Sequence, residues 1–362
     1  MTERLLLGPG PSNAAPEVLA SLSDPLVGHM DPAFLDTLDR VSSMLREVMR
    51  TSNRLTFAVS ATGSGGMEAA IVNLVEPGDT AIVCVNGVFG SRMTEVAARA
   101  GARVVTVEAP WGSPVDPQAV ASALDSHPDA RLVGIVHAET STGTRSDVQA
   151  VAAAVSGRAL LVVDAVTSLG GMPLEVDGWG IDVCYSGTQK CLSVPPGLAP
   201  ITFSDRAIER VRSRTSPVRS WYLDVTMLER YWGSDRVYHH TAPISMVNAL
   251  EAGLRLVLDE GLEARWDRHR RVASELGEAL EARGFTYVPH PDHRLPMLHC
   301  VRVPDGFDEA AERKRLLTEH GIEVGGGLGA FAGTCWRIGL MGHNARTGSV
   351  TRLLDALDRA LV

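Results

Sequence analysis

The sequence predicts an α/β fold, with a large domain built on a mainly parallel β-sheet and a smaller α+β domain at the carboxyl terminus. Three observations support this prediction. In the middle of the chain, short β-branched apolar runs alternate with Ala-rich helical patterns. From about residue 245 the pattern changes to long amphipathic helices, followed by short strand signals. The length of 362 residues is too great for one simple core.

The elements of the large domain follow one another with turn signals between them. The runs that predict buried strands are Leu55–Val59, Thr80–Val85, Arg103–Val107, Leu132–Val136, Ala159–Val163 and Asp182–Tyr185. The helical patterns are Met67–Val75, Gly90–Ala100, Asp116–Ser126 and Ser146–Val155. This alternation is typical of βα units and predicts the parallel sheet.

The pattern changes at two long amphipathic helices, Ser245–Glu260 and Leu262–Arg283, the second of which stops at Gly284. The strand signals that follow are Thr286–Val288, Leu298–Val303 and Cys335–Ile338, and the helical ones are Asp308–Glu319 and Arg346–Leu361. We therefore predict an extended Gly- and Pro-rich arm at residues 1–20, a large domain at 21–260 and a small domain at 261–362.

Composition argues against several classes of partner. The net charge is −9 and no basic run occurs, so neither nucleic acid nor an anionic membrane is expected. No stretch approaches the roughly 18–20 apolar residues of a membrane span. The start, MTERLLLGPGP, is not typical of a signal peptide. The five cysteines are scattered without a C-x-x-C pair, which predicts a reducing cytoplasm and no metal site.

Chemically active side chains follow the predicted strands. Asp164 comes directly after Ala159–Val163, and Lys190 ends the segment that follows Asp182–Tyr185. The glycine-rich turn Thr62–Gly66 precedes a helix, and the N-terminus of a helix favours a phosphate. Each feature alone has a structural explanation. Together they would lie at the carboxyl edge of one sheet, where open α/β sheets bind ligands.

This combination matches the needs of pyridoxal phosphate. The phosphate of that cofactor needs N–H groups and hydroxyls, its pyridine nitrogen needs a carboxylate, and its aldehyde needs a lysine amine. The Thr62–Ser64 turn, Asp164 and Lys190 supply all three.

Ordered motifs along nearly the whole chain resemble the class V aminotransferases of fold-type I, in particular the alanine–glyoxylate and serine–glyoxylate (serine–pyruvate) group. The motifs are LLLGPGPSNAAPEVL, VGHMDPAF, MEAAIVNLVEPGD, STGT, LLVVDAVTSLGG, YSGTQKCLSVPPG, YHHTAP, GLEARWDRHR, GGGLG and WRIGLMG. Their order and spacing are far more specific than any one motif.

The resemblance implies roles for individual residues. Lys190 would form the Schiff base and carry a proton between Cα of the amino acid and C4′ of the cofactor, while Asp164 would pair with the pyridine nitrogen. Arg337 would hold the substrate carboxylate by a two-pronged hydrogen bond. The other cofactor contacts would be Thr62, Gly63, Ser64 and Gln189 at the phosphate, Phe89 and Val166 at the ring faces, and Thr140 at the phenolic oxygen.

The resemblance also implies a homodimer with composite active sites. Tyr238 and Thr241 would reach the phosphate in the partner subunit, and Gly28 and His29 would lie near the substrate. His239 and His240 are better explained as a structural turn than as catalytic groups. The implied reaction is a ping-pong transfer of the amino group of alanine or serine to glyoxylate or pyruvate. Other donors within the family are 2-aminoethylphosphonate, pyridoxamine or a specialised-metabolite amine.

Three other functions stay open at this point. A lyase or desulfurase on the same fold needs a reactive cysteine, but Cys300 and Cys335 both fall in predicted strands, which favours buried thiols. A nicotinamide oxidoreductase needs G-x-G-x-x-G, and the Gly63–Glu68 loop lacks the final glycine. A protein that only binds the cofactor would not need Asp164, Lys190 and Arg337 together.

Overall fold

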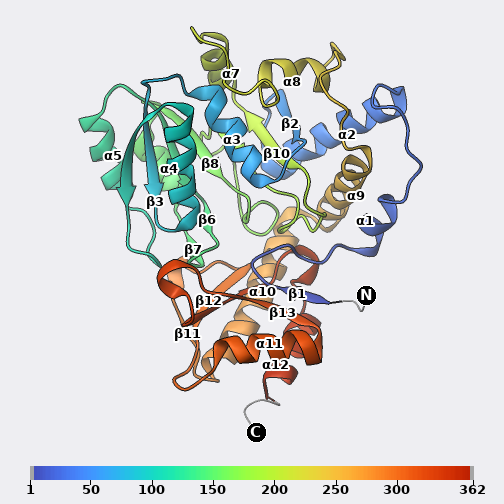
Figure 1. Cartoon of the computed structure of the whole chain (residues 1–362), viewed down its shortest axis with the longest axis vertical. Coiled ribbons are helices and arrows are strands. Elements are labelled where there is room, and N and C mark those ends of the chain that lie inside the picture. The colour runs from blue at the N-terminus through green and yellow to red at the C-terminus, as the bar shows by residue number, and fades with distance from the viewer. Residues whose placement is uncertain (1–3, 359–362) are drawn as a thin grey trace.

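The computed structural model describes residues 4–358, which form two lobes, each around its own β-sheet (Figure 1). The sheet of the upper lobe has seven strands in the order β2-β10-β9-β8-β5-β3-β4. These are β2 (Leu55–Val59), β10 (Ala199–Phe203), β9 (Val183–Tyr185), β8 (Leu160–Asp164), β5 (Ala130–Val136), β3 (Thr80–Val85) and β4 (Arg103–Glu108). Only β10 is antiparallel to its neighbours, so the sheet is mainly parallel.

Helices cover both faces of this sheet, as parallel strands require. The crossover helices are α3 (Gly63–Leu74), α4 (Val88–Ala100), α5 (Pro117–Ser126) and α6 (Val148–Val155). The sequence caps two of them: Asp116 accepts a hydrogen bond from Gln118 N, and Asp147 accepts one from Ala150 N. The remaining helices of this lobe are α1 (Pro16–Ser21), α2 (Pro32–Met49), α7 (Asp205–Arg212), α8 (Val225–Trp232) and α9 (Ile244–Glu260).

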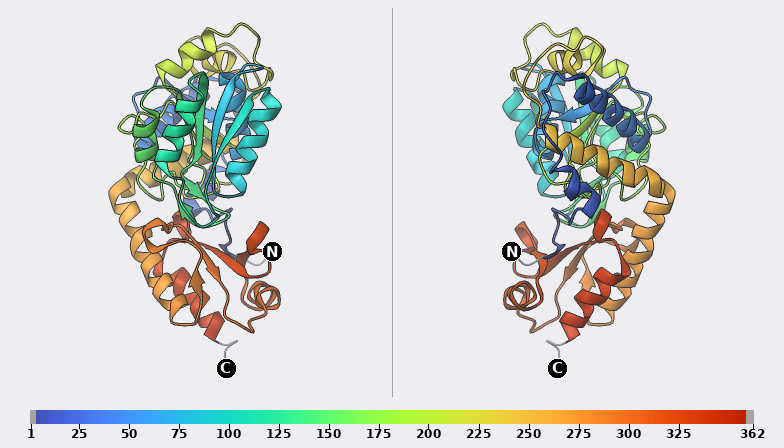
Figure 2. Two further views of the ribbon diagram at one scale, coloured as in Figure 1. Left: turned by 90° about the vertical axis from the view of Figure 1, so that its left-hand side faces the viewer. Right: turned by 90° about the vertical axis from the view of Figure 1, so that its right-hand side faces the viewer.

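The lower lobe contains a five-stranded sheet in the order β1-β13-β14-β12-β11. The strands are β1 (Leu5–Leu7), β13 (Ile322–Gly326), β14 (Cys335–Gly339), β12 (Leu298–Arg302) and β11 (Thr286–Tyr287). Helices α10 (Leu262–Glu281), α11 (Glu309–His320) and α12 (Thr347–Asp358) pack in the same lobe, and α10 runs down one side of it (Figure 2). The short hairpin of β6 (Ala138–Glu139) and β7 (Thr144–Arg145) lies between the two sheets.

The amino-terminal arm is more ordered than the expected extended segment. Leu5–Leu7 pairs with β13 as an edge strand of the lower sheet, because its apolar side chains complete that core and Leu7 is fully buried. Pro16–Ser21 is helical, and Pro16 suits the first turn of a helix. The arm therefore crosses from the lower lobe to the upper one.

Two further differences concern helices. The helix expected from Met67 begins at Gly63, because the glycine-rich turn itself forms the first turn of α3. The expected end of the last helix, Leu361, lies outside the described residues. Within residues 4–358, no helix combines the length and apolar character needed to cross a membrane.

Candidate active site

The carboxyl ends of β5, β8 and β9 and the N-terminus of α3 enclose a cavity of about 160 Å³. Nine of the predicted cofactor-binding residues line it: Thr62, Gly63, Ser64, Phe89, Thr140, Asp164, Val166, Gln189 and Lys190. Residues up to 128 positions apart in the chain (62 to 190) thus meet at one sheet edge, because parallel strands end on the same side.

Asp164 is a buried carboxylate at the end of β8. Its Oδ1 accepts a hydrogen bond from Val166 N at 2.9 Å, and its Oδ2 accepts one from the Tyr185 hydroxyl at 2.9 Å. Burial raises the pKa of Asp164 to about 6, although both hydrogen bonds favour the ionised form. The carboxylate is therefore held in one orientation, and a cationic partner would stabilise its charge.

Lys190 lies largely buried on the same side of the sheet. Its Nζ donates a hydrogen bond to the carbonyl oxygen of Pro9, from the amino-terminal arm. Gly10 leaves room for it, since a Cβ at Gly10 would lie 2.6 Å from Nζ, and the φ of +109° at Gly10 also disfavours other residues. Burial, followed by the positive charge of Arg337, lowers the pKa of Lys190 to about 8.

The N-terminus of α3 offers free donors to the cavity. Thr62 is the N-cap but makes no capping hydrogen bond with its side chain. Within the described part of the chain, the N–H groups of Gly63 and Ser64 have no acceptor. Nearby, Oε1 of Gln189 is buried without a partner. Gly63 also permits close packing, because a Cβ there would lie 2.9 Å from Cγ2 of Val166.

Glu139 is a residue that the sequence did not single out. It is completely buried, and its carboxylate accepts hydrogen bonds from Phe89 N at 3.1 Å, Gly90 N at 3.3 Å and Ser141 N at 3.0 Å. These contacts fix the first turn of α4, which carries Phe89. The segment 137–140 (HAET) follows a predicted strand, and this position indicates that it lies near the site. In an irregular hairpin, however, the side chains do not alternate regularly between the two faces, so the sequence does not show which of them is buried.

Two arginines complete the surroundings. Arg92, which no sequence motif singled out, lines the cavity. Its guanidinium lies 4.9 Å from the centre of the Phe89 ring. Arg337, in β14 of the lower sheet, is buried beside the cavity but does not line it. Its Nε donates to Gly326 O at 2.8 Å, and its Nη1 lies 3.5 Å from the carbonyl oxygen of Thr140.

Besides Arg337, four other predicted site residues do not line the cavity in the single chain: Gly28, His29, Tyr238 and Thr241. Tyr238 is 57% exposed, and its ring lies 5.0 Å from the ring of His29. His239 stacks on Trp221 with ring centres 4.4 Å apart. His29, Tyr238 and His239 thus make aromatic contacts outside the cavity.

Comparison with known proteins decides the family. The family model "Aminotransferase class-V" matches residues 11–347. The chain belongs to the class-V aminotransferases. It is similar to the crystal structure of an alanine–glyoxylate aminotransferase from Nostoc sp., with 49% identity, a TM-score of 0.98, and 100% of this chain and 96% of that one covered.

Other aminotransferases named for different donors are also similar. The (S)-ureidoglycine–glyoxylate transaminase of Bacillus subtilis is 37% identical, over 99% of this chain and 91% of its own. The structure of a pyridoxamine–pyruvate aminotransferase from Mesorhizobium loti is 33% identical, with a TM-score of 0.94 over 99% of this chain and 92% of its own. The fold-type I prediction is thereby confirmed.

Membership of the class-V aminotransferases, which depend on pyridoxal phosphate, favours transamination over the other functions left open. The structure adds that Cys300 and Cys335 are both buried, in β12 and β14, so neither sits on an open loop. A hydrogen bond with Cys335, followed by burial, raises the pKa of the Cys300 thiol.

Proposed function

We propose that the 160 Å³ cavity binds pyridoxal phosphate and that the chain uses it to move an amino group from a small amino acid to a small 2-oxo acid. The observation that carries this proposal is that one cavity contains three groups, each suited to a different part of the cofactor. An anion cradle, a buried carboxylate and a buried lysine of lowered pKa line the same 160 Å³. When bound, the cofactor would supply an electron sink for the negative charge that forms at the α-carbon of the amino acid.

The phosphate cradle would consist of the N–H groups of Gly63 and Ser64, the hydroxyls of Thr62 and Ser64, and the amide of Gln189. The free N–H groups of Gly63 and Ser64 support this assignment, because N–H groups at a helix N-terminus favour an anion. Phe89 and Val166 would flank the ring, with Thr140 hydrogen-bonded at its edge.

Asp164 would hold a proton on the pyridine nitrogen. Its two hydrogen bonds, from Val166 and Tyr185, fix the direction of the carboxylate. Burial raises the pKa of the unpaired group to about 6. A cationic ring nitrogen next to it would favour the ionised carboxylate and so would bind more tightly than a neutral one.

Lys190 would have two tasks. Its Nζ would hold the cofactor covalently, and once displaced by the amino acid it would take the proton from the α-carbon and return it later. With a pKa of about 8, part of the Lys190 amine is neutral near pH 7, and both tasks require the neutral amine.

Arg337 would hold the carboxylate of the substrate. Its Nε bond to Gly326 and its approach to Thr140 O direct the guanidinium towards the hairpin that borders the cavity. A guanidinium binds a carboxylate through two parallel hydrogen bonds. We propose alanine or serine as donor and glyoxylate or pyruvate as acceptor, in two successive half-reactions. The similarity to alanine–glyoxylate and ureidoglycine–glyoxylate enzymes supports glyoxylate as the acceptor.

Other donors are the alternative, including pyridoxamine, 2-aminoethylphosphonate or a specialised-metabolite amine. The pyridoxamine–pyruvate relative supports the first of these. A pyridoxamine donor would not need Lys190 to hold it covalently, so a panel of donors tested on one preparation separates the cases.

We also propose a homodimer in which Tyr238 and Thr241 reach the phosphate of the partner subunit. Both are exposed. Two other exposed large apolar side chains lie near His239, the residue after Tyr238: Trp221 stacks on the His239 ring, and the Tyr222 ring is tilted to it at 6.1 Å. An exposed aromatic group of this kind is typical of an interface. The five free cysteines favour a reducing cytoplasm.

The test of the cofactor assignment is spectroscopic. The purified wild type should show the visible absorption band of a lysine-linked cofactor, and Lys190→Ala should lack it while keeping its far-ultraviolet circular dichroism. Borohydride reduction and peptide mapping should label Lys190. Labelling of Lys314, the other lysine of the chain, would refute the assignment. Loss of the wild-type band on adding alanine, serine or pyridoxamine would then identify the donor.

A further inference from the structure

Arg92 brings a positive charge to the 160 Å³ cavity of the proposed cofactor site, which we call the catalytic cavity. It lies on α4, which packs beside α3 (Figure 1), and its side chain is exposed. Further along α4, Arg99 pairs with Glu95 at 2.6 Å. Within residues 4–358 Arg92 has no such carboxylate partner, and its one hydrogen bond runs from Nη1 to Ser64 Oγ at 3.4 Å. This charge is therefore available to a ligand.

The guanidinium of Arg92 contacts two groups of the proposed cofactor site. One is the Ser64 hydroxyl of the phosphate cradle, and the other is the Phe89 ring, whose centre lies 4.9 Å from the guanidinium. Phe89 and Arg92 are three positions apart on α4, and this spacing places two side chains on the same face of a helix. Since an arginine can only donate, Ser64 Oγ accepts from Arg92, and the hydroxyl proton of Ser64 is free to be donated to an anion.

The charge balance of the cavity leaves the phosphate to Arg92. Of the described residues, three with charged side chains line the cavity: Arg92, Asp164 and Lys190. In the proposed function, Asp164 faces the pyridine nitrogen and Lys190 bonds to the aldehyde, so neither is available to the phosphate. A phosphate monoester carries a charge of about −1.5 to −2 near neutral pH, whereas the N-terminus of a helix contributes only about half a positive charge. The N-terminus of α3 alone therefore leaves most of the phosphate charge uncompensated.

We propose that Arg92 is a phosphate-binding residue of the cofactor site, which acts through its guanidinium and through the Ser64 hydroxyl that it holds. This inference rests on the proposed function and adds a cationic group to a cradle of N–H groups and hydroxyls. A guanidinium suits the task because its planar set of donors matches the oxygens of a phosphate and because it stays charged at any working pH. A role confined to holding the Phe89 ring would instead act on the cofactor ring and not on its phosphate.

The experiment compares two aldehydes on the cofactor-free protein. Pyridoxal phosphate and pyridoxal have the same ring and the same aldehyde, but only the first carries a phosphate. The absorption band of the lysine-linked form gives the dissociation constant of each. Arg92→Gln should weaken the binding of pyridoxal phosphate roughly tenfold, because hydrogen bonds to a charged group are the stronger ones, and should change the binding of pyridoxal less than about twofold.

Two further variants and a second measurement support the comparison. Arg92→Lys keeps the charge but loses the planar set of donors, so it should recover part of the affinity for pyridoxal phosphate. Arg99→Gln is the matched control, because it removes an exposed arginine of α4 that pairs with Glu95 outside the cavity. In a calorimetric titration of the cofactor-free protein with inorganic phosphate, Arg92→Gln should also bind about tenfold more weakly than the wild type. Because Arg92 is exposed, its variants should fold, and far-ultraviolet circular dichroism checks this.

The outcomes separate the role of Arg92 from the proposed function. An unchanged dissociation constant for pyridoxal phosphate in Arg92→Gln would overturn the role of Arg92. Equal weakening of both aldehydes would also overturn it, since the effect would then act through the Phe89 ring alone. Both of these results require a wild-type band and so leave the proposed function standing. A wild type that forms no band with pyridoxal phosphate would refute the proposed function itself.

Discussion

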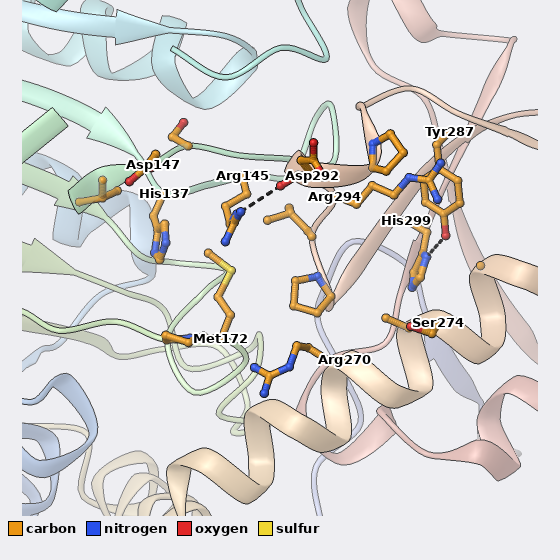
Figure 3. A pocket seen from close by; sticks show the side chains of 18 of the residues that line it. His137, Arg145, Asp147, Met172, Arg270, Ser274, Tyr287, Asp292, Arg294 and His299 are labelled. Atoms are coloured by element: carbon orange, nitrogen blue, oxygen red, sulfur yellow. Dashed lines mark hydrogen bonds between the residues drawn. The ribbon is translucent and has the colours of Figure 1, made fainter. Parts of the chain in front are cut away.

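The two cavities of this protein differ in how the chain builds them. The catalytic cavity takes its polar groups from strand ends and from one helix N-terminus, all in the upper lobe. A second cavity, of about 690 Å³, lies between the two lobes (Figure 3), and we call it the interdomain cavity. It takes its polar groups from a hairpin, a long helix and an irregular loop. The first arrangement follows from the rule for parallel sheets, whereas the second depends on how two lobes happen to dock.

The acid–base properties of the cavities differ in the same way. In the catalytic cavity, burial raises the pKa of Asp164 to about 6 and lowers that of Lys190 to about 8. In the interdomain cavity, burial lowers the pKa values of His137 and His299 to about 3, so both stay neutral near pH 7. Groups that titrate near neutrality suit proton transfer, and neutral donors suit binding. The comparison therefore favours the catalytic cavity as the place for proton transfer.

The largest expected effect comes from removing the carboxylate of the catalytic cavity. Asp164→Ala should lower kcat by roughly 10²–10³-fold, because the group that stabilises the charge of the transition state is lost. Steady-state kinetics, normalised to bound cofactor, measure this. Asp182→Ala is the control, since Asp182 is a buried carboxylate of the same sheet that lies outside the cavity. Equal kcat values for the two variants would refute a specific role of Asp164 in the reaction.

The fold of the upper lobe was predictable because its central strands are buried on both faces and because its strands alternate with helices. The predicted run Thr80–Val85 is β3 to the residue, and Arg103–Val107 differs from β4 by one residue. The antiparallel β10 was not predicted, since its residues, Ala199–Phe203, form a short run whose direction depends on its neighbours. Helix α2, although amphipathic, was also missed.

The second effect concerns Arg337, which joins the lower sheet to the catalytic cavity. Arg337→Gln should raise KM for the amino acid and the oxo acid alike, roughly a hundredfold, because both carboxylates lose the same charged partner. The cofactor band should persist. Arg283→Gln is the control, as Arg283 pairs with Asp358 elsewhere in the lower lobe. Unchanged KM values, or a change for one substrate only, would contradict a shared carboxylate site.

The parts of the site that the sequence did not reveal come from outside the strand ends. The contact of Pro9 O with Lys190 depends on the path of the arm between lobes. Arg92 belongs to none of the sequence motifs that predict the cavity. It lines the cavity because α4 packs beside α3. The predicted positions of Tyr238 and Thr241 require a second subunit, and their exposure in one chain agrees with that requirement without testing it.

A third prediction uses pH. Uptake of pyridoxal phosphate by the cofactor-free protein needs the neutral amine of Lys190, so its rate should rise with pH through about 8 and then level off. The positive charge of Arg337 lowers this pKa, so Arg337→Gln should move the midpoint upward, towards the ordinary value of a lysine. Stopped-flow absorbance measures the profile. A midpoint that stayed fixed or moved downward would show that Arg337 and Lys190 are not coupled.

The smallest expected effect is at Glu139, which acts through its neighbours. Its charge raises the pKa of Asp164, so Glu139→Gln should lower that pKa from about 6 towards the usual value of an aspartate. The loss of cofactor affinity at acidic pH should then begin at a lower pH than in the wild type. A glutamine keeps one acceptor for the first turn of α4, so kcat should fall only a few-fold, whereas Glu139→Ala should also weaken the position of Phe89. If Glu139 has only a structural role, both variants should be less stable than the wild type. The pH at which cofactor affinity falls in acid should then be unchanged, and that outcome would contradict electrostatic coupling between Glu139 and Asp164.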